Sequence, residues 1–120
     1  KVIILGLTFK ENCPDTRNSK VADIYNQLVK YGIRPIVIDP WASELEAKHE
    51  YGIELSTLSA CKDADCIIFA VAHKEFKDMK LDDISKLYKN VPSNEKVLID
   101  VKGLFSVADL NNAGFAWWRL

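Results

Sequence analysis

The chain has 120 residues, the length of a single domain, and its 48% hydrophobic and 28% charged residues are ordinary for one globular core. A net charge of −1 gives no overall attraction to nucleic acid or to a membrane surface, so any bound anion needs a local cluster of cations. No signal peptide is visible, and no apolar run approaches the roughly 20 residues of a membrane helix.

The first half of the chain predicts two strands and two helices. The run KVIILGL at 1–7 is apolar throughout and rich in β-branched residues, which favours a strand buried on both faces. A loop follows, and then a helix is expected from near Asn18 to Gly32. Its apolar residues recur at helical spacing: Val21, Ile24, Tyr25, Leu28 and Val29. Pro40 should end a second strand at 34–40, before a short helix at 43–51.

The second half continues the alternation. In chain order we expect a short helix or turn at 57–64, a strand at 65–73, a helix broken in two over about 75–89, a strand at 95–103, a helical turn at 105–110 and an edge strand at 113–120. Strands that alternate with helices predict the α/β class, as a Rossmann-like three-layer sandwich with a mostly parallel sheet over residues 1–120. Because the chain starts with Lys1 inside a strand, we expect it to be excised from a longer protein.

The loop at 8–17 is long for a connection from strand to helix, where two to six residues are usual. Ligands of open parallel sheets bind outside the carboxyl ends of the strands. The residues there are Thr8, Phe9, Lys10, Asp39, Pro40, His73, Lys74, Lys102 and Gly103. Lys10 and Lys102 should converge from neighbouring strand ends, and Arg17 sits where a helix N-terminus also attracts anions. We call this edge, with Lys10, Lys102 and Arg17, the rim, and its cations predict an anionic ligand.

A glycine-rich GxGxxG turn is missing after the first strand. The stretch GLTFKENCP therefore lacks the glycines that let backbone approach a pyrophosphate, and the ordinary nicotinamide dinucleotide site is absent. Long cationic side chains can take over that task, because they reach phosphates from a distance.

Several of these residues also have a purely structural interpretation, and both remain open. Lys10 and Lys102 can be solvated surface residues, and Arg17 can pair with Asp15 or Glu11. Asp39 either grips a ribose or caps the turn before Pro40. His73 either joins the anion rim or serves as a hydrogen-bonded loop residue. Trp117 and Trp118 either stack on a base or pack on the sheet or on a partner domain.

The histidines and cysteines show no ligand spacing, so no metal site is predicted. Three cysteines without a CxxC argue against a disulfide framework and favour a reducing cytoplasm. Cys13 has no histidine near it in sequence to activate it as a nucleophile, and Cys66 is expected in the core.

Two motifs carry a family resemblance over essentially all 120 residues. GLTFKENCPDTRNSKVADI resembles the start of the C-terminal, UDP-binding domain of the UDP-glucose/GDP-mannose dehydrogenase family, where G-[FL]-[AT]-F-K precedes D-x-R-x-S and a helix. LIDVKGLF resembles the family's second block, an Asp-x-Lys/Arg-Gly turn. FKENCPDTRNSKV and VAHKEF are most similar to the branch that oxidises UDP-N-acetylhexosamines for surface polysaccharides.

The resemblance implies an NAD-dependent enzyme that oxidises C6 of a UDP-hexose or UDP-N-acetylhexosamine from alcohol to uronic acid. Its N-terminal NAD domain, a connecting helix that makes a homodimer and the catalytic cysteine all lie outside this chain, so the chain alone is expected to be inactive. By motif position, Phe9, Lys10 and Lys102 would bind the UDP-sugar, and Arg17 would reach toward the NAD. No catalytic residue, nucleic acid or membrane partner is implied.

A second hypothesis is a non-enzymatic Rossmann-like module that senses a nucleotide or docks a partner. An exposed patch of Phe115, Trp117 and Trp118 would favour docking.

Overall fold

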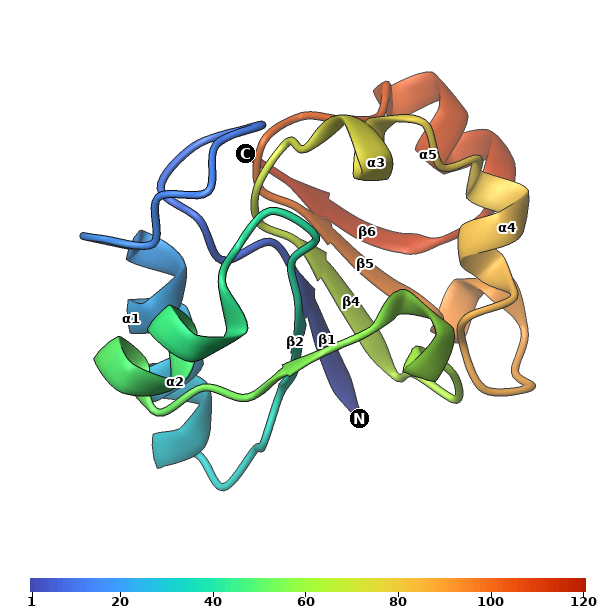
Figure 1. The fold of residues 1–120 in the computed structure, drawn as a ribbon. Helices are drawn as coiled ribbons and strands as arrows, with labels where there is room; N and C mark the ends of the chain where they lie inside the picture. Colours follow the sequence, from blue (N-terminus) through green and yellow to red (C-terminus); the bar gives the residue numbers. More distant parts are fainter.

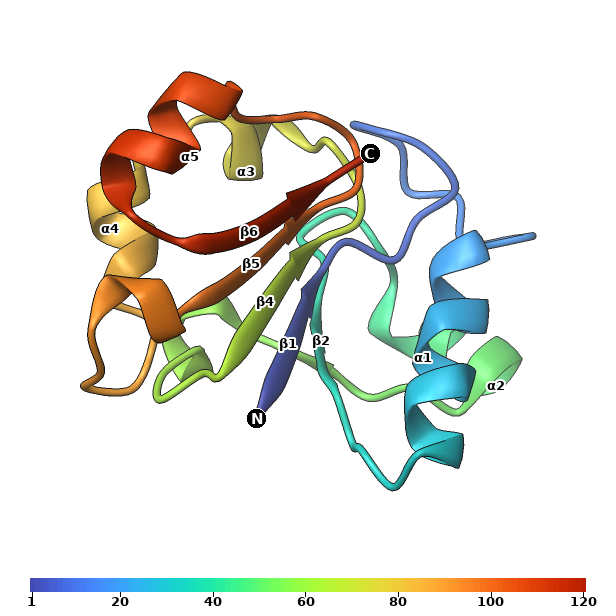
Figure 2. The same ribbon diagram turned by 180° about the vertical axis from the view of Figure 1, so that it is seen from behind.

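The computed structural model describes residues 1–120, which form one sheet of six parallel strands (Figures 1 and 2). The strands lie in the order β3-β2-β1-β4-β5-β6. Their bounds are β1 Val2–Leu5, β2 Ile36–Ile38, β3 Leu55–Ser56, β4 Cys66–Phe69, β5 Val97–Asp100 and β6 Ala116–Arg119. This order confirms the Rossmann-like prediction, with every strand pair parallel.

Serine side chains begin the three longest helices. Ser19 caps α1 (Lys20–Lys30), Ser43 caps α2 (Glu44–Tyr51) and Ser106 caps α5 (Val107–Ala113), each hydroxyl accepting a backbone N–H three residues on. The helical stretch after β4 is broken in two, as predicted, into α3 (Lys74–Lys77) and α4 (Leu81–Ser85). None of the helices has the length and apolar character that crossing a bilayer requires.

Helices cover both faces of the sheet. Figure 1 shows α1 and α2 on one side and α3, α4 and α5 on the other, and Figure 2 shows the same layers from behind. The alternation of side chains along β1 serves both layers, because Ile3 and Leu5 join the larger core cluster while Ile4 joins the smaller one. A strand buried on both faces explains the unbroken apolar run at the start of the sequence.

The side on which successive strands join the sheet changes after β3, because β4 pairs with β1 on the side opposite β2. The strands β1, β2 and β3 extend the sheet toward one edge, and β4, β5 and β6 extend it toward the other. Such a switch point leaves a ligand crevice outside the strand ends in many open α/β sheets. The loop of residues 8–17 and the connection that contains His73 therefore meet at this switch point.

Candidate functional site

Lys10 and Lys102 lie at the same edge of the sheet, but not on neighbouring strands. Lys10 follows β1 and Lys102 follows β5, and β4 lies between these two strands. The expectation of neighbouring strand ends is therefore wrong, because the switch point inserts β4 between them. At about 4.8 Å between strands, the two strand ends are separated by about 10 Å. Long lysine side chains can still meet one ligand across that separation.

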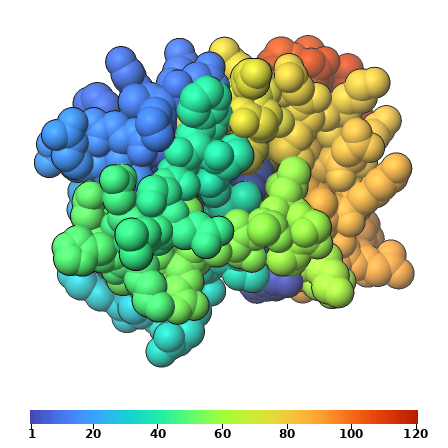
Figure 3. Space-filling view, in the orientation of Figure 1, coloured from blue at the N-terminus to red at the C-terminus, as the bar shows by residue number.

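The side chains of this rim are open to solvent. Lys10 and Lys102 are exposed, and neither ammonium group takes part in an ion pair. Phe9 is 58% exposed, an unusual position for a phenylalanine without a partner. In Figure 3 the loop after β1 (blue), the turn after β2 (blue-green) and the α3 segment (yellow) form one continuous surface at this edge. The rim therefore offers an aromatic ring and two unpaired cations.

Gly6 closes the crevice at the switch point. Its φ of +108° is outside the range that other residues favour, and a Cβ there would lie 2.5 Å from the Val71 Cβ. The end of β1 is thus packed against the chain that leaves β4. No backbone cradle for a pyrophosphate remains at this point, which agrees with the missing GxGxxG turn.

Asp39 is a buried hub of hydrogen bonds. Its Oδ2 accepts the N–H groups of Leu7 (2.6 Å) and Thr8 (3.0 Å), and its Oδ1 accepts those of Trp41 (2.7 Å) and Ala42 (3.0 Å). The carboxylate therefore caps the turn at Pro40 and ties the end of β2 to the end of β1. With only 6% of the residue exposed, it is not placed to grip a ribose.

The environment of Asp39 favours its charged form. Burial alone would raise its pKa, but the hydrogen bond with His73 and the N–H groups of Leu7, Thr8 and Trp41 outweigh burial and lower it. The carboxylate is thus charged and fully engaged within the protein.

His73 lies inside the protein rather than on the rim. Its side chain has no exposed surface, and its Nε2 lies 3.0 Å from Asp39 Oδ2. Its Nδ1 accepts the N–H of Asn12 from the long loop at 2.9 Å. The hydrogen-bonded interpretation of His73 is therefore confirmed, and its role as a direct ligand group is wrong because no face of the ring is accessible.

Arg17 forms the ion pair with Asp15 that the sequence allowed. The guanidinium donates from Nε to Oδ1 and from Nη2 to Oδ2, both at 3.0 Å. These side-chain hydrogen bonds lower the pKa of Asp15 to about 2. The Arg17 side chain remains 78% exposed. Its Nη1 edge points away from the carboxylate and remains available to a further anion.

The turn after β5 is fixed by a second buried carboxylate. Asp100 is fully buried and accepts the N–H groups of Leu104 and Phe105, each at 2.9 Å. This turn holds Lys102 at the rim. Beside it, Arg119 at the end of β6 places its guanidinium against Gly103, where an added Cβ would lie 3.1 Å from Nη2. The sequence placed Asp100 in the Asp-x-Lys-Gly turn but did not reveal its two hydrogen bonds, and Arg119 was not identified as part of this edge.

The cysteines show no sign of a reactive thiol. Cys13 is half-buried in the long loop, and no hydrogen bond joins it to a base. Burial raises the pKa of the Cys66 thiol to about 11 and also raises that of Cys61, which disfavours the thiolate at both positions. No group of three or more histidine, cysteine or acidic side chains lies close enough together to hold a metal ion.

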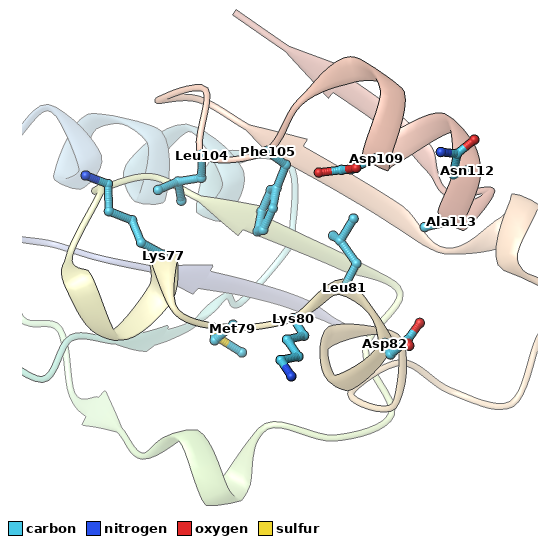
Figure 4. Close-up of a pocket in the computed structure, with 10 residues that line it drawn as sticks. All are labelled: Lys77, Met79, Lys80, Leu81, Asp82, Leu104, Phe105, Asp109, Asn112 and Ala113. Atoms are coloured by element: carbon cyan, nitrogen blue, oxygen red, sulfur yellow. The ribbon is translucent and has the colours of Figure 1, made fainter.

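A groove of about 530 Å³ opens between α3–α4 and α5 (Figure 4). Leu104 and Phe105 form part of its wall, just after the Lys102 turn. Its charged lining is balanced, with Lys77 and Lys80 against two aspartates, so it offers a diphosphate no net attraction. The cationic rim, rather than this groove, is the better anion site.

The aromatic residues near the end of the chain do not form the exposed patch that would favour docking. Phe115 is buried, and Trp117 is half-buried against the larger core cluster. The Trp117 indole also donates to Asn111 Oδ1 at 2.9 Å. Of these three aromatic residues only Trp118, 55% exposed, remains open to solvent. The packing interpretation of Trp117 is thus confirmed.

Comparison with known proteins gives consistent matches. The sequence model of the UDP binding domain of the UDP-glucose/GDP-mannose dehydrogenase family matches residues 3–107. A UDP-N-acetyl-D-glucosamine 6-dehydrogenase of Pseudomonas aeruginosa is 50% identical over 104 residues, which are 87% of this chain and 24% of that protein. Protein CapL of Staphylococcus aureus is 39% identical over 116 residues, 97% of this chain and 26% of its own length.

A solved structure shares the fold over almost the whole chain. The NDP-N-acetyl-D-galactosaminuronic acid dehydrogenase of Methanosarcina mazei Go1 aligns with a TM-score of 0.84 at 22% identity, over 99% of this chain and 24% of that one. The present chain therefore spans about a quarter of the length of the proteins that it matches.

Proposed function

Because the chain belongs to the UDP-binding domain family of the UDP-glucose/GDP-mannose dehydrogenases, we propose that it is the nucleotide-sugar-binding domain of an NAD-dependent UDP-sugar 6-dehydrogenase. The observation that carries this proposal is the pair of exposed, unpaired lysines, Lys10 and Lys102, at one edge of the sheet. The strand ends that precede these lysines are about 10 Å apart, and long lysine side chains can both reach one diphosphate, which carries charge on two phosphorus centres. Phe9 and Lys10 bind the UDP end, and Lys102 approaches from the β5 side.

The main NAD site belongs to the rest of the protein in this proposal. The closed crevice at Gly6 and Val71 does not fit a pyrophosphate. Arg17 offers its free Nη1 edge toward the cofactor, because Asp15 already holds the opposite edge. Residues 1–120 then act as the C-terminal domain beside an N-terminal NAD domain, in a cytoplasmic homodimer. The catalytic groups come from that other domain.

Activity of the full-length protein tests the proposal. With NAD and UDP-N-acetylglucosamine it should form NADH and the uronic acid product, since relatives at 50% and 42% identity are named UDP-N-acetyl-D-glucosamine 6-dehydrogenases. UDP-N-acetylgalactosamine and UDP-glucose are tested as alternative substrates in the same spectrophotometric assay. The 120-residue chain alone should form no NADH. Absence of turnover of any UDP-sugar by the full-length protein would contradict the enzymatic proposal and favour a nucleotide-sensing module.

The two lysines should each contribute measurably to UDP affinity. In the full-length protein, Lys10→Ala or Lys102→Ala should weaken UDP binding by about 1–3 kcal/mol, the size of one charge-assisted hydrogen bond. Isothermal titration calorimetry at fixed ionic strength measures the loss. Lys30→Ala is the matched control, because Lys30 lies in the last turn of α1, away from the carboxyl edge. Equal affinity in wild type and in both rim variants would contradict the assigned site.

A further inference from the structure

The long loop is joined to the far side of the switch point by a pair of reciprocal hydrogen bonds. The Asn12 N–H donates to His73 Nδ1, and the Lys74 N–H donates to Asn12 Oδ1, both at 2.9 Å. These partners lie more than 60 residues apart in sequence. Asn12 has a φ of +52°, a conformation that asparagine tolerates better than most residues. We call this pair of bonds the Asn12–His73 clasp.

The hydrogen bonds of the clasp fix the position of the imidazole proton. Because Nδ1 accepts the Asn12 N–H, the proton of the neutral ring lies on Nε2. Nε2 faces two acceptors, Asp39 Oδ2 and Thr8 Oγ1, each at 3.0 Å. The Thr8 hydroxyl can accept there because it donates its own hydrogen to the Lys10 carbonyl at 3.1 Å. Every polar atom of the ring is therefore used within the protein.

The clasp and its neighbours bracket the part of the loop that reaches the rim. Thr8 bonds to the carbonyl of Lys10 on one side, and Asn12 is anchored on the other. Across the base of the loop, the Phe9 N–H donates to the Asp15 carbonyl at 2.7 Å. Phe9 and Lys10 thus project from a segment whose backbone is tied at both ends, although their own side chains are free.

We propose that His73 is a positioning residue for the UDP site, acting through Asn12 to hold Phe9 and Lys10 at the rim. This inference rests on the proposed function and names the buried group on which the site depends. His73 touches no ligand, because its side chain is completely buried. Its Nδ1 acts on the loop, and its Nε2–H is oriented by Asp39. Pre-ordering the loop reduces the conformational entropy that ligand binding would otherwise cost.

Two substitutions separate the roles of the two ring nitrogens. In His73→Asn, the short amide oxygen lies near the position of Nδ1 and keeps an acceptor for Asn12. In His73→Gln, the amide nitrogen of the longer side chain replaces the Nε2–H toward Asp39, and the acceptor for Asn12 is lost. We expect His73→Gln to lose about tenfold in UDP affinity, the value of one ordinary hydrogen bond. His73→Asn should lose less affinity even where it lowers stability, since the clasp survives.

A spectroscopic readout tests the clasp without any ligand. In the wild-type chain, ¹⁵N spectra should show the proton of the His73 ring on Nε2, and the Asn12 amide should exchange slowly with solvent. His73→Gln should accelerate exchange at Asn12, whereas His73→Asn should leave it slow. Asn12→Gly tests the other half of the clasp. It keeps the N–H and the positive φ but removes the acceptor for Lys74, and it should weaken UDP binding several-fold.

The outcomes distinguish this inference from the proposed function. If wild type binds UDP and His73→Gln binds it equally well, the positioning role is wrong while the UDP site stands; where His73→Gln does not fold, the ring tautomer and the Asn12 exchange rate of the wild type decide. A ring proton on Nδ1, or fast exchange at Asn12 in wild type, would also overturn the clasp. If wild-type full-length protein binds no UDP, the proposed function fails together with the positioning role.

Discussion

Replacing Asp39 with asparagine should lower the free energy of unfolding by about 3–5 kcal/mol, the cost of removing one partner from a buried charged network. The carboxylate accepts four backbone N–H groups and faces His73. An asparagine side chain retains one oxygen and turns an NH₂ group toward donors, so at least two N–H groups lose their acceptor. Urea unfolding of the 120-residue chain at pH 7 measures the loss.

The pH dependence of this loss identifies its cause. The pKa of Asp39 is lower in the folded protein than the value of about 3.9 in an unfolded chain. The stability it contributes is therefore complete above that unfolded value and is lost as pH falls through the folded value. The difference between wild type and Asp39→Asn should stay constant from pH 7 to 5 and shrink below about pH 4. A difference that persists unchanged into acid would exclude the carboxylate charge as its origin.

An exposed carboxylate supplies the control for Asp39. Asp78 lies at the end of α3, is exposed and forms no ion pair. Asp78→Asn should change the free energy of unfolding by less than about 0.5 kcal/mol, as most surface substitutions do. Since Asp39 holds the N–H groups of Leu7 and Thr8 at the base of the long loop, Asp39→Asn should also weaken UDP binding in the full-length protein.

The fold was largely predictable because its signals are local. The apolar run that became β1 and the helical stripe of α1 each stand in one continuous segment. The strand β3 was not predicted, because its two residues, Leu55 and Ser56, are too short to show any period. Its place in the sheet comes from pairing with β2, a contact that the sequence does not display.

The candidate site was only partly predictable, because its organisation depends on contacts between distant residues. From their positions after predicted strands, Asp39 and His73 were correctly placed at one edge of the sheet. That they bond to each other, 34 residues apart, requires the switch point that brings β1 beside β4. Arg119 was missed for a different reason, because a signal for its position was present in the sequence. The helix between β5 and β6 indicates a parallel crossover, which would have placed the end of the last strand at the same edge.

Replacing Gly6 with alanine should destabilise the chain by about 2–6 kcal/mol, and two separate effects contribute. The φ of +108° is costly for any residue with a Cβ, by about 1–3 kcal/mol. The new Cβ would also lie 2.5 Å from Val71 Cβ and 2.8 Å from the Val71 backbone nitrogen, which adds an overpacking cost of about 1–3 kcal/mol. Thermal or urea unfolding of the purified chain measures the sum.

Gly32→Ala separates the backbone cost from the clash. Gly32 has a φ of +82°, but a Cβ there would meet nothing within 4 Å. Its substitution should therefore cost only the strain of the backbone. The additional loss of stability in Gly6→Ala then measures the contact between β1 and the chain leaving β4. Val71→Ala should not rescue Gly6→Ala, because the Val71 Cβ and backbone nitrogen remain in place. Full rescue would mean that the strand ends can move apart, and the closed crevice, which in the proposed function leaves a diphosphate to side chains instead of backbone, would lose its physical basis.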